Sequence, residues 1–155
     1  MSKLLFAVVS ATVAVLVVFG AATVSAANDH TLPPPDVFVD ENPCTGLDTT
    51  ITQTYKKAVF HFSEDGNGGG HVTGTLVGTI ETADGFSGRF TIWFGENLSG
   101  DGEHFVGTFT FSATLHNDAG QQVVVHETGH ITVVDGEIIV EVEHTIFECR
   151  GKPAA

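Results

Sequence analysis

The sequence predicts an all-β domain, a single antiparallel meander that closes into a small β-barrel. Three observations lead to this fold class. Nothing after residue 36 has helical periodicity, β-branched and aromatic runs alternate with turn sequences, and those turns are short enough to join neighbouring strands as hairpins. A two-sheet β-sandwich accommodates the same strands and is the alternative.

Residues 1–27 have the pattern of a secretory signal peptide. Lys3 precedes an apolar run that ends near Gly20, and small residues at 24–27 provide a signal peptidase site. We therefore expect a secreted, extracellular protein that has no membrane contact after cleavage. Residues 28–36 contain three consecutive prolines and predict an extended lead-in, because proline cannot donate a hydrogen bond to a sheet.

The barrel domain is expected to cover residues 37–151, followed by a disordered tail at 152–155. Turn sequences such as Asp84-Gly85 and Asp135-Gly136 divide it. A short strand is predicted near 37–41, and longer strands near 49–62, 71–82, 86–96, 103–116, 121–134 and 137–148.

The turns also predict a strand register. A two-residue turn at Asp135-Gly136 places His130 opposite Glu141, and a three-residue turn at 118–120 places Phe109 opposite Gly129. In this register one face of the sheet is apolar, and on it glycines stand opposite large side chains of the neighbouring strands. Gly74 is opposite Phe94, Gly78 is opposite Phe90, and Gly88 lies between Ile80 and Phe111. The last strand would add Ile138, Val140, Val142 and Ile146 to this face. Large residues beside small ones suit a curved sheet.

The composition is strongly acidic. The chain has 19 Asp and Glu against six Lys and Arg. Loss of Lys3 with the signal leaves 19 acidic against five basic residues, a formal charge of −14. Nucleic acid is excluded as a partner, since its binding requires clustered basic residues.

Two cysteines, Cys44 and Cys149, lie near the two ends of the mature domain. In an oxidising compartment they are expected to form a disulfide that joins the start of the domain to its last strand.

The residues His126 to His130 match the sequence H-E-x-x-H, which holds zinc when both imidazoles lie on one helix face. The surrounding β-branched residues predict a strand instead, on which the two histidines would stand about 13 Å apart. His61 and His71 flank a Gly-rich loop and could meet across that hairpin. We expect no metal and no cofactor.

Glu127 and His144 face each other in the predicted register, on the otherwise apolar side. A carboxylate beside an imidazole in a sheltered cavity is an acid–base candidate, but the simpler interpretation, which we favour, is a cross-strand contact that only satisfies both groups.

Ten of the 12 phenylalanines lie after the signal sequence. They either fill the barrel or line a cavity for an apolar ligand, and the choice depends on the interior volume. The candidate ligand-binding residues are Phe90, Phe94, Phe105, Phe109 and Phe111, with His61 and His71 at the rim.

Residues 42–46 read N-P-C-T-G, and residues 60–71 follow the pattern F-H-x-x-x-D-x-N-G-G-x-H. With the late Cys149, these motifs resemble a family of bacterial secreted proteins of uncharacterised function. The chain departs from that family at Gly70, where a larger residue is expected. The resemblance implies a secreted, disulfide-closed β-domain and no catalytic residues.

Three functions remain open from the sequence. The first is a non-catalytic barrel that binds a small apolar ligand or an extracellular partner. The second is an enzyme of the cyclase or isomerase kind that uses the barrel cavity. The third is a structural protein that associates through a Thr-rich outer face containing Thr108 and Thr110. The oligomeric state does not follow from the sequence.

Overall fold

The structure is a computed structural model in which residues 32–151 are described. The predicted signal peptide, residues 28–31 of the lead-in and the tail at 152–155 lie outside the described residues. Within them are seven strands: β1 (Asp36–Asn42), β2 (Leu47–Glu64), β3 (Gly70–Thr82), β4 (Ser87–Leu98), β5 (His104–His116), β6 (Gln122–Val134) and β7 (Glu137–Arg150). Every predicted strand is confirmed to within two residues at each end. No helix in this part of the chain is long and apolar enough to span a membrane.

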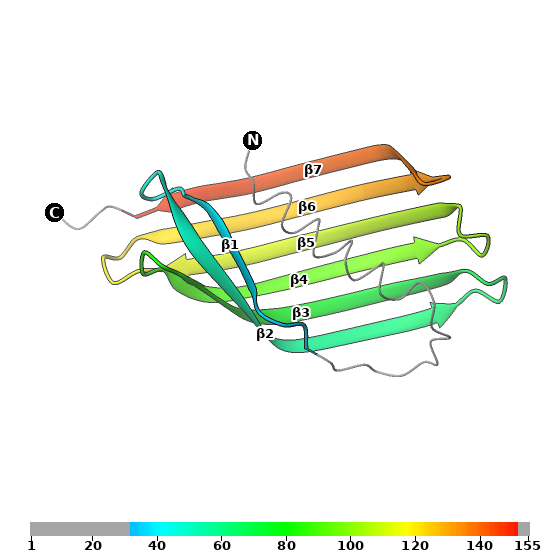
Figure 1. The fold of residues 1–155 in the computed structure, drawn as a ribbon, viewed down its shortest axis with the longest axis horizontal. Coiled ribbons are helices and arrows are strands. Elements are labelled where there is room, and N and C mark those ends of the chain that lie inside the picture. Colours follow the sequence, from blue (N-terminus) through cyan, green and yellow to red (C-terminus); the bar gives the residue numbers. More distant parts are fainter. Residues whose placement is uncertain (1–31, 152–155) are drawn as a thin grey trace.

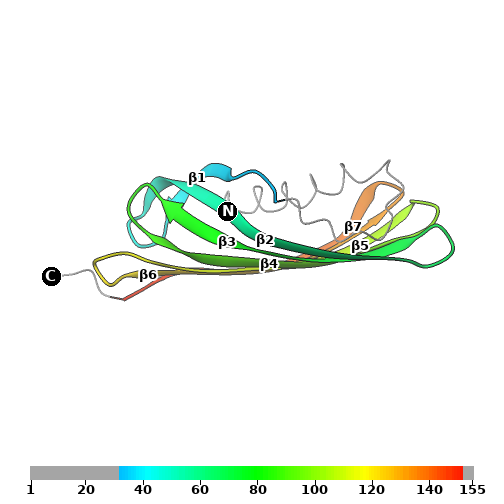
Figure 2. The same ribbon diagram turned by 90° about the horizontal axis from the view of Figure 1, so that it is seen from below.

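The strands form one antiparallel sheet in chain order, β1 to β7, which confirms the predicted meander (Figure 1). The sheet curls into a half-barrel. A bulge at Lys56 interrupts the pairing of β2 with β3, and β1 and the first part of β2 cross over one half of the sheet. Figure 2 shows this cover on one side of the curved sheet. The sheet therefore has a concave and a convex face.

Under this cover the interior of the half-barrel is filled with side chains. Phe86, Phe90 and Phe111 are at most 2% exposed. The ring of Tyr55 meets Phe90 edge-on at 5.4 Å between centroids, and Phe111 lies 6.0 Å from Phe90 on the other side. A cavity of about 30 Å³ lies in this half, which has room for one or two water molecules.

The N-P-C-T-G sequence closes one end of the half-barrel. Asn42 accepts a hydrogen bond from the backbone of Cys44 at 2.8 Å and donates one to Asp84, in the β3–β4 turn, at 2.7 Å. Cys44 and Cys149 form the predicted disulfide, with 4.9 Å between their Cα atoms. The two edge strands, which are not hydrogen-bonded to each other, are thus joined covalently.

Most of the predicted large-to-small pairs are present. Gly74 pairs with Phe94, Gly78 with Phe90, and Gly129 with Phe109. The prediction for Gly88 is half right. Gly88 pairs with Ile80 on β3, as expected, but its partner on β5 is Leu115 and not Phe111.

The predicted register of β7 is wrong beyond its first two residues. The turn forms as expected, with positive φ at Asp135 (53°) and Gly136 (78°) and Val134 paired with Glu137. A bulge at Ile139 then shifts the register, so His130 pairs with Val142 and not with Glu141.

Side-chain packing in the filled half of the half-barrel explains this shift in register. The bulged register places Phe147 opposite Val125 and Cys149 opposite Val123, on the concave face. There Phe147 packs against the core and Cys149 reaches Cys44. The shift also moves Val140, Val142 and Ile146 to the convex face, where all three are exposed. Glu141 and Glu143 take their place on the concave face.

Candidate functional site

The candidate site is the half of the concave face that no described strand covers, which we call the open concave face. It lies beyond the crossing strands β1 and β2, toward the right of Figure 1. Its apolar side chains come from the second half of β2 and from β3 to β7: Phe60, Phe62, Val72, Phe94, Leu98, Phe105, Phe109, Ile131, Val133 and Ile138. Phe62 is 38% exposed and Leu98 48% exposed, although both lie on the face that elsewhere forms the core.

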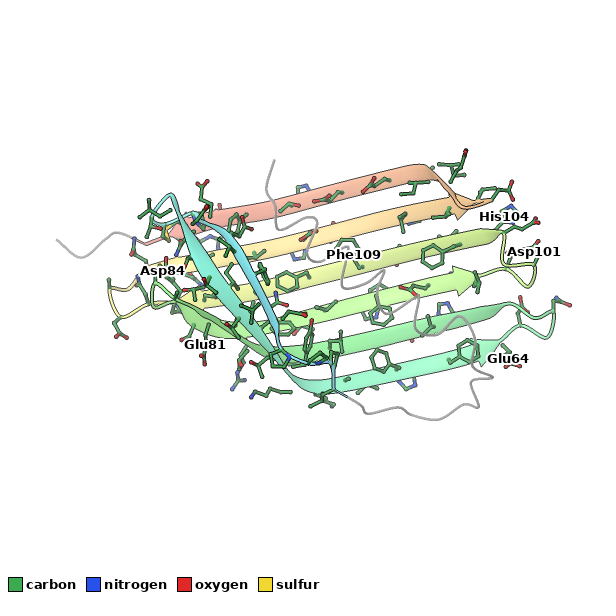
Figure 3. The ribbon with its side chains drawn as sticks, in the orientation of Figure 1. Glu64, Glu81, Asp84, Asp101, His104 and Phe109 are labelled. Atoms are coloured by element: carbon green, nitrogen blue, oxygen red, sulfur yellow. A yellow bond between two sulfur atoms is a disulfide. The ribbon has the colours of Figure 1, made fainter. Side chains whose placement is uncertain are left out.

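Glycines shape the floor of this face. A Cβ atom on Gly129 would lie 2.1 Å from the ring of Phe109, one on Gly74 2.2 Å from Phe94, and one on Gly107 2.9 Å from Phe105. The three rings therefore lie over glycines, and Figure 3 shows Phe109 near the middle of the sheet. A row of aromatic rings seated in this way makes a continuous apolar surface.

The structure separates the predicted phenylalanines into two groups. Phe90 and Phe111 belong to the filled core and are 1% exposed. Phe105 and Phe109 lie on the open concave face and are half-buried, whereas Phe94 lies on that face and is buried. The interior is thus filled in one half and open in the other.

The histidines of the sheet and four of its glutamates lie on opposite faces. By their register, the described histidines all lie on the convex side, together with Lys57 and Arg89. Beside the open concave face lie Glu96, Glu127, Glu141 and Glu143. The only ion pair within residues 32–151 joins Arg150 to Glu148, so none of these four carboxylates has a basic partner there.

Glu127 is the most unusual of these side chains. It is 1% exposed, and neither carboxylate oxygen has a hydrogen-bond partner. Burial, together with the nearby charge of Glu143, raises its pKa to about 7. It lies where the two halves meet, opposite the core residue Phe111 on β5 and the exposed Thr145 on β7.

Glu96 is the second perturbed carboxylate. It is 7% exposed on β4, between Val72 and Gly107 on the neighbouring strands. Burial raises its pKa to about 7. Glu96 pairs with Gly107 and Glu127 pairs with Phe111, four residues farther along β5. The two carboxylates therefore lie on either side of the Phe94–Phe109 pair.

The predicted acid–base pair is not formed. Because of the bulge at Ile139, Glu127 pairs with Thr145, and His144 pairs with Thr128. Successive residues of a strand point to opposite faces, so Glu127 and His144 are separated by the sheet. No local sequence pattern predicts this bulge, which allows Phe147 and Cys149 to face the core farther along the strand.

The H-E-x-x-H segment is a strand, as expected, within β6. His126 is hydrogen-bonded to Ser112 at 2.9 Å, and His130 to Thr132 at 3.3 Å. Both imidazoles are on the convex face while Glu127 is on the concave face. This arrangement does not assemble the zinc site that the motif forms on a helix.

His61 and His71 do not line the phenylalanine surface. Both are exposed on the convex face, two register positions apart on β2 and β3. Nδ1 of His71 is hydrogen-bonded to Oδ1 of Asn97 at 2.8 Å. The predicted rim of the ligand site is therefore separated from the phenylalanines by the sheet.

One cluster was missed from the sequence. Asp101, Glu103 and His104 bring their potential ligand atoms within 4.8 Å of one another in the β4–β5 loop, where Figure 3 labels Asp101 and His104. All three are exposed. Asp101 already accepts hydrogen bonds from the Ser99 hydroxyl and the Glu103 backbone, which accounts for the loop geometry.

Comparisons of the chain with protein-family models, curated proteins and solved structures found no match.

Proposed function

We propose that this protein is a secreted binder of a small apolar ligand, which it holds on the open concave face. The observation that supports the proposal is the row of half-buried and exposed apolar side chains on a face that elsewhere forms a packed core. A contiguous exposed apolar surface of this kind is typical of a binding site. The disulfide between Cys44 and Cys149 supports an oxidising, extracellular location.

Binding is favoured over catalysis because the acid–base pair expected from the sequence does not exist. None of the described histidines lies on the same face as Glu127, and His144 is on the other side of the sheet. The open concave face belongs to the same sheet as the filled core, which holds the strands in place. Such a preorganised surface reduces the entropy lost when a ligand is bound.

The proposal is tested with Nile red, a neutral apolar dye that fluoresces when it leaves water. We expect saturable binding to the oxidised, mature protein. Phe109→Ala should weaken binding about fivefold or more, because it removes a central ring worth about 1–2 kcal/mol of contact. Phe105→Ala serves as a second variant if Phe109→Ala does not fold.

The matched control is Trp93→Ala, which removes an aromatic side chain that is 44% exposed on the convex face. It should leave the affinity for Nile red unchanged. The proposal is wrong if the dye does not bind, or if Trp93→Ala weakens binding while Phe109→Ala and Phe105→Ala do not.

A further inference from the structure

Glu127 is a buried carboxylate, and neither of its oxygens has a hydrogen-bond partner among the described residues. A buried charged or polar oxygen without a partner costs free energy, and native proteins rarely retain one without a function. It lies on β6 next to Gly129, the glycine that carries the ring of Phe109. By its register, Glu127 therefore lies on the concave face where the filled core ends and the open concave face begins.

The surroundings of Glu127 favour a cation over an anion. On β7, Glu143 is half-buried on the same face and close enough for its charge to act on Glu127. The Thr145 hydroxyl donates a hydrogen bond to Glu143 at 2.8 Å, and Glu143 is the partner of Gly129 on the neighbouring strand. Glu141 is the next residue of β7 on this face, and Glu96 lies on β4.

No described basic side chain forms an ion pair with these groups. Arg150 is paired with Glu148, Arg89 and Lys57 lie on the convex face with the seven described histidines, and Lys56 is exposed at the bulge of β2. A ligand that supplies both a positive charge and N–H donors would satisfy the Glu127 oxygens, since charge-assisted hydrogen bonds to a carboxylate are among the strong ones.

We propose that the ligand of the open concave face is an apolar amine, whose hydrocarbon body lies on the rings of Phe94, Phe105 and Phe109 and whose protonated amino group is bound by Glu127 and Glu143. This inference rests on the proposed function and specifies its ligand class. Glu127 acts here as the hydrogen-bonding anchor, and Glu143 as the second negative charge.

The test compares three ligands that share one hydrocarbon chain: decylamine, 1-decanol and decanoate. Each is titrated calorimetrically into the oxidised mature protein at pH 8. We expect decylamine to bind about tenfold or more tightly than 1-decanol, and decanoate to bind most weakly, because the anion meets uncompensated carboxylates.

Glu127→Gln keeps the shape of the side chain and removes its charge. It should abolish the preference for decylamine over 1-decanol while 1-decanol binds as before. Glu143→Gln, at a half-buried position, should reduce the same preference and is the second variant if Glu127→Gln does not fold. The control, Glu81→Gln, changes an exposed glutamate on the convex face of β3 and should leave both affinities unchanged.

The outcomes separate the two proposals. Equal binding of decylamine and 1-decanol, or a preference that survives in both Glu127→Gln and Glu143→Gln, overturns the amine assignment and leaves apolar binding in place. Failure of all three ligands to bind overturns the proposed function itself.

Discussion

The ring of Phe109 lies directly over Gly129, its partner on the neighbouring strand, so closely that a Cβ atom on Gly129 would be 2.1 Å from Cε1 of the ring. This contact joins β5 to β6 at the centre of the open concave face. Phe94 lies over Gly74, its partner on β3, in the same way, and Phe105 lies over Gly107 of its own strand. The shape of the proposed ligand surface therefore depends on glycine at these positions.

Gly129→Ala should lower the free energy of unfolding by about 1–3 kcal/mol, because the Phe109 ring must leave its position. Urea denaturation measures the change. In a Phe109→Ala background the same substitution should cost little, since nothing then occupies the space above residue 129. The explanation fails if Gly129→Ala is equally costly in both backgrounds. Gly95→Ala is the control and should cost less, because a Cβ atom there would be 3.1 Å from the Trp93 ring, which is exposed on the convex face.

The disulfide is expected to contribute strongly to stability because it joins the two edge strands of an unclosed sheet. It spans 105 residues, for which the chain-entropy relation gives about 3–5 kcal/mol. Replacing both Cys44 and Cys149 by Ala should lower the free energy of unfolding by this amount. Reduction of the unmodified protein should give the same value, and a loss below about 1 kcal/mol in both would contradict the account.

Stability should fall as the pH rises from about 4.5 to about 7. The folded protein holds the proton of Glu127 more tightly than the unfolded chain does, because the pKa rises from 4.5 to about 7 on folding. The stability that Glu127 contributes is therefore fully present below its pKa in the unfolded chain. It is lost as the pH rises through its pKa in the folded protein. Glu96 contributes in the same direction.

Glu127→Gln should flatten this dependence. Between pH 5 and pH 8 the variant should lose about 1–3 kcal/mol less than the unmodified protein, measured by urea denaturation at both pH values. Glu81→Gln, whose side chain is exposed, should keep the original slope. Identical slopes for all three proteins would show that Glu127 titrates as an ordinary exposed glutamate.

Deleting Ile139 should preserve the fold. The residue is the unpaired member of the bulge between the pairs Thr132–Val140 and Val133–Ile138, so its removal leaves both pairs and every later one intact. The variant should therefore form the Cys44–Cys149 disulfide and show no free thiols after oxidative folding. Two free thiols would indicate that β7 takes another register when the bulge is removed.

The bulge also marks the limit of what could be predicted from the sequence. Short turns and local alternation were enough to predict seven strands, the pairing of Phe109 with Gly129 and the I′-like turn at Asp135-Gly136. The register of β7 was wrong because it depends on distant packing: Phe147 and Cys149 must face the core, and Ile139 is displaced to allow this. The error moved His144 to the wrong face and produced a pair with Glu127 that does not form.

The sequence also could not predict that one half of the interior is open. Phe90, Phe94, Phe105, Phe109 and Phe111 all alternate correctly toward one face, and nothing in that pattern distinguishes core from open surface. The distinction comes from the bend in β2 near Lys56, which carries β1 over Phe90 and Phe111 and leaves Phe105 and Phe109 beyond the cover.

The most direct test of the account is an NMR titration of the oxidised, isotope-labelled mature protein with 1-decanol, in which amide shifts are followed residue by residue. If the open concave face is the ligand site, the largest shifts should fall on Phe105, Phe109 and Ile131, with little change in the filled half near Thr79 and Arg89. Shifts centred on Thr79 and Arg89, or the absence of any saturable shift, would contradict the account.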